Sequence, residues 1–368
     1  MDSDLILVIV VGTALIFDFT NGFHDTANVV ATSISTRAMP PRLAVAYAAL
    51  FNFIGAFISL EVAATVAKDV VDGGAITPTV VFAGLIGAIS WNLLTWYYGL
   101  PSSSSHALIG GVVGAAFAAA GADAVLGDGL TSKVLIPAVV APLVAFVVGV
   151  IAINIAYGVV GRERPGPVTR GFRWGQVVSG GMLALAHGTN DAQKTMGVIT
   201  LALIANGTLA SDAGVPFWVV VSAATAIALG TYTGGWRIIR TMGTRIIKMD
   251  SAQGFSAQGA GAAVILASTH FGFPLSTTQV ISGGVMGAGA GKRVSAVRWG
   301  IAGNIVTAWL LTLPCAGVVG AATYGVSRLF GTGAAGPVVI AAAALAAGLL
   351  LFIRRLNQGS PLPAGGGA

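Results

Sequence analysis

The sequence predicts an all-α, polytopic membrane protein built from two inverted-topology repeats with broken helices, followed by one extra C-terminal helix. Three observations lead to this fold class. The 368 residues are 55% hydrophobic and only 9% charged, a composition typical of membrane proteins and not of soluble enzymes. Two polar motifs occur in both halves of the chain in the same order, and the basic residues gather in alternate connections between apolar segments.

Eleven apolar segments are expected to form the helices within the membrane. They lie at approximately residues 5–20, 43–60, 79–98, 102–121, 133–160, 175–206, 215–236, 256–271, 277–291, 299–325 and 336–353. Most of them contain the about 20 residues that an α-helix needs to cross about 30 Å of hydrocarbon. Glycine and alanine crowd these segments, as expected where the helices of a membrane bundle approach one another closely.

The positions of the lysines and arginines set the orientation of the segments. When the connection that carries Arg37 and Arg42 is placed inside, strict alternation puts 15 of the 19 basic residues inside and three outside. Cytoplasmic connections of membrane proteins carry such an excess. We therefore expect a multi-pass protein of the cell (plasma) membrane, with its N-terminus outside and its C-terminus in the cytoplasm. The net charge of +6 then reflects topology, and nucleic acid is not an expected partner.

The first polar motif, Asn21–Asn28, directly follows an apolar run and has a second copy at His187–Lys194. The aspartates of the two copies, Asp25 and Asp191, are 166 positions apart. Charged and amide side chains at membrane depth must line a protein or water-filled cavity, because hydrocarbon offers them no hydrogen bonds. A polar kink that pairs with a neighbouring helix would explain one such stretch, whereas two copies indicate a binding site.

This motif supplies oxygen ligands. Asp25 and Asp191 provide carboxylates and the nearby asparagines provide amide oxygens. Gly22 and Gly188 are expected to let the backbone unwind and expose its own carbonyl groups. Hard monovalent cations bind such oxygens, whereas a proton needs only the carboxylate. The predicted cation-binding residues are Asn21, Asp25, Asn28, Asn190 and Asp191.

The second polar motif offers the opposite chemistry. It begins at Pro101 in the first half and at Pro274, 173 positions later, in the second, and each copy opens a new apolar helix. Proline suits the first helical turn, and Ser or Thr side chains there cap free backbone N–H groups. Capping would use a single hydroxyl, so a run of hydroxyls at a helix N-terminus predicts an anion site. The predicted anion-binding residues are Ser103, Ser104, Ser105, Ser276, Thr277 and Thr278.

The two motif pairs define a sequence repeat. Each copy holds five apolar segments, an odd number, so the copies must cross the membrane in opposite directions. We expect a first inverted repeat at 1–160, a short basic cytoplasmic linker at 161–174, a second inverted repeat at 175–325, and an extra transmembrane helix with a C-terminal tail at 326–368. Inverted repeats with polar interruptions at matching positions predict a secondary transporter with its site between the copies.

Three further motif residues are candidates for proton handling or ion pairing: His24, His187 and Lys194. Lys194 lies three residues after Asp191 on the same helical face, so we expect it to pair with Asp191 or with Asp18. An unpaired buried lysine would tend to lose its charge; direct contact with the anion is the alternative. His24 is the leading candidate for a proton-handling role because imidazole titrates near neutral pH.

On these motifs the sequence resembles the inorganic phosphate transporter (PiT) family across nearly the whole chain, in particular the bacterial low-affinity phosphate transporters. The residues that carry the resemblance are Gly22–Asn28, Gly188–Asp191, Pro101–His106 and Pro274–Gln279. The resemblance implies symport of inorganic phosphate with H⁺ or Na⁺, inverted repeats, re-entrant hairpins that carry the proline motifs, and a homodimer in the lipid bilayer.

The same resemblance bears on the coupling ion. The sodium-coupled members usually carry Asn where this chain has His24, and a different pair where it has Gln193 and Lys194. His24 beside Asp25 is similar to the pattern of the proton-coupled bacterial members, some of which carry neutral metal–phosphate complexes. The resemblance therefore favours H⁺ and leaves Na⁺ open.

We expect no catalytic residues, no resident metal and no cofactor, apart from the co-transported H⁺ or Na⁺. A Ser–His–Asp enzyme within the membrane would not need duplicated sites, and the sequence lacks both a Gly-x-Ser-x-Gly and a His-Glu-x-x-His motif. A channel would not need paired, inverted gates. The nearest alternative is a permease of the same fold for sulfate or another oxyanion; phosphate is favoured because it can donate a hydrogen bond to a carboxylate.

Overall fold

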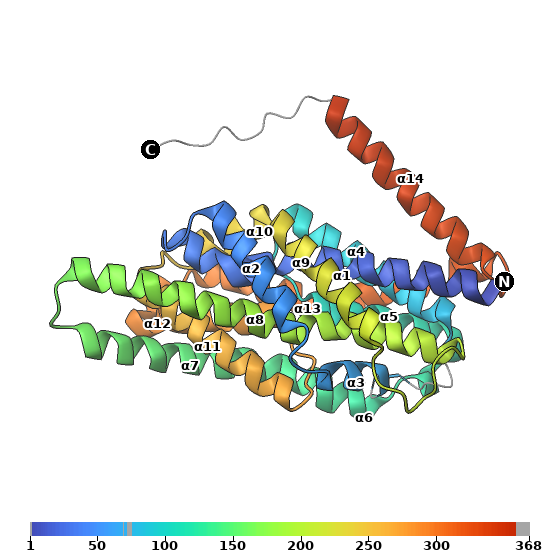
Figure 1. The fold of residues 1–368 in the computed structure, drawn as a ribbon, viewed down its shortest axis with the longest axis horizontal. Coiled ribbons are helices and arrows are strands. Elements are labelled where there is room, and N and C mark those ends of the chain that lie inside the picture. Colours follow the sequence, from blue (N-terminus) through green and yellow to red (C-terminus); the bar gives the residue numbers. More distant parts are fainter. Residues whose placement is uncertain (1, 69, 72–75, 358–368) are drawn as a thin grey trace.

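The computed structural model describes residues 2–68, 70–71 and 76–357 as an elongated bundle of helices (Figure 1). Met1 and the predicted C-terminal tail beyond residue 357 lie outside the described residues. Within those residues, strand pairing is limited to one isolated bridge between Val71 and Val125. The prediction of an all-α fold is confirmed.

Each predicted apolar segment coincides with one helix or with adjoining helices. The first half of the chain forms α1 (Asp2–Ser35), α2 (Pro41–Gly55), α3 (Glu61–Lys68), α4 (Pro78–Tyr98), α5 (Ser104–Ala120), α6 (Gly127–Leu130) and α7 (Ile136–Val160). The second half forms α8 (Pro165–Ala205), α9 (Phe217–Thr233), α10 (Trp236–Arg240), α11 (Ser251–His270), α12 (Thr277–Lys292) and α13 (Trp299–Arg328), and α14 (Ala335–Asn357) follows.

Several of these helices are long and apolar enough to cross a membrane. Within the described residues, four helical stretches meet this requirement on their own: Asp4–Ser35, Pro78–Tyr98, Gly127–Val160 and Trp299–Arg328. Phe217–Thr233 and Trp236–Arg245, bent by 59° relative to each other, would form a fifth span. The other helices of the described part of the chain do not meet it; the 41-residue α8, for example, carries a polar centre. This is the pattern of a multi-pass membrane protein.

The helices α1 and α8 run through both copies of the first polar motif without a break. The expectation that the backbone unwinds at Gly22 and Gly188 is therefore wrong. The two glycines instead permit close helix packing: a Cβ at Gly22 would lie 2.4 Å from the carbonyl oxygen of Ile227 in α9, and one at Gly188 would lie 2.2 Å from that of Asn52 in α2. The backbone carbonyls of the motif stay within the helices, so the site depends on side-chain oxygens.

The connection between the two halves is shorter than expected. The helix α8 begins at Pro165, so only residues 161–164 separate it from α7, and most of the expected linker at 161–174 is helical. Pro165 suits this position because a proline in the first turn of a helix loses no helical hydrogen bond. Arg162 and Arg164 therefore lie in the connection, whereas Arg170 and Arg173 lie in the first turns of α8.

Two helical hairpins turn inside the bundle. The first joins α4 to α5 through residues 99–103, and the second joins α11 to α12 through residues 271–276. The start of α12 contacts Asp25 of α1 and the start of α5 contacts Lys194 of α8, so both turns lie beside the interior of a long helix and not at the end of the bundle. Re-entrant hairpins stay a prediction, because α4 is also long and apolar enough to cross a membrane.

Corresponding helices of the two halves make corresponding contacts. The helix α5 packs against α13 and α12 packs against α7, while α1 packs against α9 and α8 against α2. A Cβ at Gly114 of α5 would lie 2.1 Å from the carbonyl oxygen of Gly317, and one at Gly287 of α12 would lie 2.1 Å from that of Phe146. Gly114 and Gly287 hold the same position in the two copies of the proline motif. Each hairpin is thus packed against a helix of the other half.

The last helix stands apart from this arrangement. The helix α14, red in Figure 1, starts beside α13 and the beginning of α1 and then extends away from the main body of the bundle. It supplies the extra helix expected after the second half, although the described part of the chain shows it packed only through its first turns.

The packing at Gly188 can be tested by two matched substitutions in α8. Gly188→Ala should lower the stability of the protein in detergent by about 1–3 kcal/mol, because its Cβ would overlap the backbone of Asn52. Gly171→Ala is the control, because nothing lies within 4 Å of a Cβ there, and alanine should stabilise that helical position by up to about 1 kcal/mol. Thermal unfolding of both variants measures the difference; equal melting temperatures would contradict the close approach.

Candidate functional site

The residues predicted from both motif pairs converge on one buried region. They come from the interior of α1 and α8 and from the first turns of α5 and α12. Each of the predicted cation-binding, anion-binding and proton-handling residues is at most 3% exposed. The structure therefore brings together motifs that are separated by more than 150 residues, and it encloses them completely.

The two motif carboxylates meet where α1 passes α8. Asp25, His187 and Asp191 each offer a ligand atom, and these atoms lie within 4.8 Å of one another. Two carboxylates at this separation repel each other in a buried site unless a cation or a proton lies between or beside them. This group could hold a cation by the placement of its ligand atoms, and it combines one residue of the first copy of the motif with two of the second.

His24 joins the carboxylate of Asp25 to the first hairpin. Its Nδ1 is 2.7 Å from Asp25 Oδ1, and its Nε2 is 3.1 Å from Oγ1 of Thr95 in α4. The Thr95 hydroxyl donates to the carbonyl of Trp91 and accepts from Ser102, both at 2.8 Å, which leaves one lone pair for His24. An imidazole with an acceptor at each nitrogen can hold two protons. Both ring nitrogens of His24 therefore lie beside hydrogen-bond acceptors.

Lys194 pairs with Asp191, the first of the two partners considered from the sequence. Its Nζ is 2.5 Å from Asp191 Oδ1 and also donates to Ser105 Oγ at 2.6 Å and to the carbonyl of Leu275 at 2.7 Å. Lys194 thus satisfies all three of its N–H donors. Ser105 lies in the first turn of α5, and Leu275 lies just before α12. The ammonium group of Lys194 therefore connects both hairpin turns to α8.

The remaining oxygen of Asp191 faces the second hairpin. Thr277 Oγ1 donates to Asp191 Oδ2 at 3.1 Å, and His187 Nε2 lies 3.1 Å from the same atom. The other ring nitrogen of His187 is 3.2 Å from Asn52 Oδ1 in α2. The carboxylate is therefore surrounded by groups from α8 itself, from the start of α12 and, through His187, from α2.

The hydroxyl groups of the proline motifs divide into two sets. Ser103 and Ser276 accept hydrogen bonds from the backbone N–H groups of His106 and Gln279, at 3.1 and 3.3 Å, so these two predicted anion ligands are N-caps of α5 and α12. The two serine oxygens accept hydrogen bonds from backbone N–H groups at the starts of these helices. For these two residues, helix capping is therefore the correct interpretation of the motif. The four other predicted hydroxyl groups, which follow the caps, remain the candidates for an anion site.

Those four hydroxyl groups line the carboxylates and the contact between the hairpins. Thr278 Oγ1 donates to Asp25 Oδ1 at 3.2 Å, and Ser104 Oγ lies 3.5 Å from His24 Nδ1. Ser105 Oγ donates to the Leu275 carbonyl at 3.0 Å, which joins the two hairpin turns directly. The backbone N–H groups in the first turn of a helix have no partner within it, so two helix N-termini offer donors in the same enclosed region.

The contacts across the site are paired between the two halves. Asn28 Nδ2 donates to Thr278 Oγ1 at 2.9 Å, and Lys194 donates to Ser105 Oγ; Asn28 and Lys194 hold the same position in the first motif, as Ser105 and Thr278 do in the second. His106 Nδ1 and Gln279 Nε2, also equivalent in the motif, lie 3.4 Å apart. The hairpin turns therefore meet through equivalent positions.

Several buried amide oxygens lack a hydrogen-bond donor. Among the described residues these include Oδ1 of Asn21, Asn28 and Asn190. The amide nitrogens of Asn28 and Asn190 are held by Thr278 and Thr269, at 2.9 and 2.8 Å, so the orientation of both side chains is fixed. A buried carbonyl oxygen without a donor is costly unless a cation or water supplies the missing contact. These atoms fit the oxygen set that was predicted for a cation.

Asp18 is a site residue that the sequence analysis considered only as a partner for Lys194. It is fully buried, and neither carboxyl oxygen has a hydrogen bond of acceptable geometry. Thr195 and Asn21 are its polar neighbours, and Asp191 and Lys194 are the nearby charges. A signal was present in the sequence: positions 18, 21, 25 and 28 follow the spacing of one helical face. Asp18 therefore extends the polar face of α1 beyond the motif.

Comparisons with known proteins identify the family of this chain. The model of the phosphate transporter family matches residues 21–168 and 161–320. A protein of Mycobacterium bovis named "Probable low-affinity inorganic phosphate transporter" is 56% identical over 327 residues, which cover 89% of this chain and 78% of the relative. A Bacillus subtilis protein of the same name is 46% identical over 327 residues, covering 88% of this chain and 98% of the relative.

A solved structure described as a sodium-dependent phosphate transporter has the same fold. The TM-score is 0.79 at 24% sequence identity, over 88% of this chain and 99% of the other. The family matches include both copies of each polar motif. Together with relatives of about half-identical sequence over nearly nine-tenths of the chain, they establish that this chain belongs to the phosphate transporter family.

Proposed function

We propose that this protein imports inorganic phosphate by symport with a cation across the cell membrane. The observation that carries the proposal is the enclosed site in which two carboxylates, Asp25 and Asp191, lie beside two helix N-termini that carry hydroxyl groups. Because relatives that are 56% and 46% identical are named as phosphate transporters, the chain is a transporter and not an enzyme.

The charges of the site explain why an anion would travel with a cation. Lys194 offsets the charge of Asp191, whereas Asp25 has a histidine as its only basic partner among the described residues. A phosphate ion at the hairpin turns would add at least one further negative charge to a buried region. Such an ion is repelled by Asp25 until a cation or proton neutralises that carboxylate, because charges interact strongly where water is excluded.

The proton is the favoured coupling ion. His24 and Asp25, 2.7 Å apart, form a pair that can store a proton, and the acceptor at each ring nitrogen supports a charged imidazole. Sodium remains the alternative, supported by the amide oxygens of Asn28 and Asn190 that lack a donor. A cation bound there would be cargo, released with each transport cycle, and not a resident metal.

Phosphate is the favoured substrate within the class of tetrahedral oxyanions. At neutral pH it retains a proton that it can donate to Asp25 or Asp191, whereas sulfate has none, so a site with two carboxylates discriminates against sulfate. The alternative function is a permease for sulfate or another oxyanion of the same fold. A neutral metal–phosphate complex is a second form in which phosphate could enter, since it would bring its own cation to the carboxylates.

We further propose that the two halves are inverted repeats that exchange access to the site between the two sides of the membrane. The equivalent contacts of α5 with α13 and of α12 with α7 support this symmetry. A site enclosed by elements of both repeats can open to one side or the other when the repeats move against each other. The proposal includes the predicted orientation, with the N-terminus outside and the C-terminus in the cytoplasm, and a homodimer.

Uptake of radiolabelled phosphate into proteoliposomes tests the function. An imposed proton gradient alone should drive accumulation that saturates with phosphate and that excess sulfate does not inhibit. Accumulation only under a Na⁺ gradient would show that the coupling ion is sodium and not the proton. Transport of sulfate without phosphate would move the protein to the alternative function, and uptake that never exceeds equilibrium would contradict symport.

Substitution of the motif carboxylates tests their role in coupling. Asp25→Asn and Asp191→Asn should each reduce phosphate accumulation at least about tenfold, because neither amide can bind a proton or balance a cation. The control is Asp123→Asn, an exposed acidic residue in the connection after α5. All variants are compared at equal amounts of protein in the proteoliposomes. Accumulation by Asp25→Asn at the level of the control would remove that carboxylate from the mechanism.

Alanine substitution of the hairpin hydroxyls tests the anion site. Ser104→Ala and Thr277→Ala should each raise the phosphate concentration for half-maximal uptake by about 10-fold or more, since a hydrogen bond to a charged ligand contributes about 1.5–3 kcal/mol. The dependence of phosphate uptake on the cation should not change in either variant. Ser132→Ala, at an exposed serine after α6, is the control. Unchanged half-saturation in both variants would exclude these hydroxyls from the phosphate site.

A further inference from the structure

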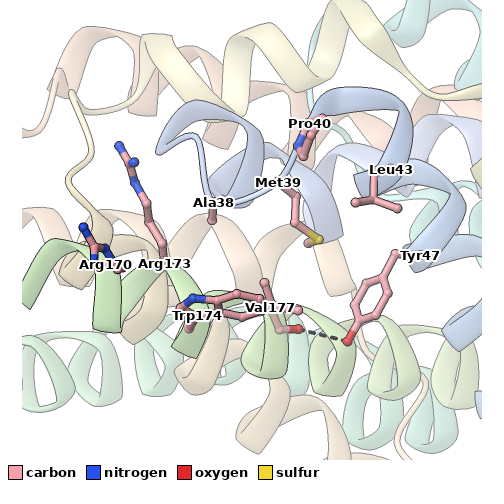
Figure 2. Close-up of a pocket in the computed structure, with 9 residues that line it drawn as sticks. All are labelled: Ala38, Met39, Pro40, Leu43, Tyr47, Arg170, Arg173, Trp174 and Val177. Atoms are coloured by element: carbon pink, nitrogen blue, oxygen red, sulfur yellow. Dashed lines mark hydrogen bonds between the residues drawn. The ribbon is translucent and has the colours of Figure 1, made fainter. Parts of the chain in front are cut away.

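A pocket with mixed chemistry lies far from the transport site, between the start of α2 and the first turns of α8 (Figure 2). It has a volume of about 350 Å³. Figure 2 shows two arginines at one end of the pocket and Leu43 with Tyr47 at the other, with Trp174 between them. The lining residues are Ala38, Met39, Pro40, Leu43, Tyr47, Arg170, Arg173, Trp174 and Val177.

The apolar end of the pocket is rigid and open. The Tyr47 hydroxyl donates to the carbonyl of Val177 at 3.0 Å, which fixes α2 against α8. Tyr47 can approach α8 this closely because residue 181 is a glycine. A Cβ at that position would lie 2.4 Å from the Tyr47 hydroxyl oxygen. Leu43 and Trp174 remain 56% and 69% exposed. The pocket therefore offers an apolar wall that no side chain of the described structure covers.

The arginines at the other end are available to a ligand. Among the described residues, neither Arg170 nor Arg173 takes part in an ion pair or in a side-chain hydrogen bond. They are three positions apart and so lie on the same face of α8, and both also line a second cleft of about 400 Å³ at the beginning of that helix. Guanidinium groups bind phosphate oxygens in pairs of parallel hydrogen bonds.

The surroundings place this pocket at the edge of the hydrocarbon region. Beyond it along α2 and α8, the exposed side chains are apolar, including Leu50, Val178 and Met182 at 57%, 64% and 53% exposed. In the other direction, the connection that precedes α8 exposes three charged residues, Arg162, Glu163 and Arg164. An exposed tryptophan between an apolar and a basic surface is typical of the membrane–water interface. The arginines therefore lie at the level of lipid headgroups.

We propose that this pocket binds one anionic glycerophospholipid of the cytoplasmic leaflet. The headgroup phosphate would contact Arg170 and Arg173, and an acyl chain would run along Leu43 and Val177. Charge complementarity selects an anionic headgroup over a zwitterionic one. Free phosphate would use only the arginine end and would leave the apolar wall exposed, so the combination of both surfaces favours the lipid. This site is independent of the transport site and of the proposed coupling.

Native mass spectrometry of the full-length protein in detergent tests the proposal, with dioleoyl phosphatidylglycerol as the probe and dioleoyl phosphatidylcholine as the zwitterionic comparison. The wild-type protein should retain one phosphatidylglycerol per chain in preference to phosphatidylcholine. Arg170→Gln with Arg173→Gln should bind it about 30-fold more weakly, because two cationic contacts are lost. Both arginines are exposed, so the double variant should fold normally.

Two further variants separate a specific site from general attraction. Arg162→Gln with Arg164→Gln removes the same charge from the preceding connection without changing a lining residue, and it should retain the lipid. Leu43→Ser should weaken lipid binding while both arginines are intact. Equal binding by the two double variants would overturn the proposal. Displacement of the lipid by inorganic phosphate, together with unchanged binding by Leu43→Ser, would assign the arginines to a free anion and overturn it as well.

Discussion

The structure depends on the enclosure of two carboxylates, Asp25 and Asp191, at a depth where the membrane offers no water. Burial of a charged group is costly unless its hydrogen bonds and its charge are balanced. Asp191 is balanced by the ammonium group of Lys194, which also holds both hairpin turns. Among the described residues, the side-chain partners of Asp25 are His24 and the Thr278 hydroxyl. Asp25 therefore lacks the cationic partner that Asp191 has, and this asymmetry is the basis for proposing that a mobile cation binds at Asp25.

The fold serves this site through close backbone contacts. The long helices α1 and α8 carry the carboxylates as continuous helices, and glycines at 22 and 188 bring α9 and α2 against them. The hairpin turns lie beside these helices, so the N-termini of α5 and α12 face the carboxylates and not the membrane surface. Because the hairpins pack against helices of the opposite half, a movement of one half must change the environment of both copies of the motif. That coupling is what an alternating-access transporter needs.

The sequence alone predicted the all-helical class, the two motif pairs and their convergence, because duplication is visible in the residues themselves. It could not predict the role of Gly22 and Gly188, since unwinding and close packing call for the same residue and the deciding partner, such as Ile227, is distant in the chain. The sequence also could not show which hydroxyl groups cap the helices and which line the site, because this depends on the residues at which α5 and α12 begin. The place of Asp18 in the site was not predicted because this residue precedes the motif, although it lies on the same helical face.

The central claim is that phosphate and a cation occupy one enclosed site and neutralise each other there. Calorimetry of phosphate binding to the purified protein tests it most directly, with titrations at several Na⁺ concentrations and in two buffers of different ionisation enthalpy. We predict linkage: phosphate binding should be accompanied by uptake of protons by the protein, or its affinity should rise with Na⁺, and the effect should be lost in Asp25→Asn. Phosphate binding that takes up no proton and is indifferent to Na⁺ would contradict a shared site.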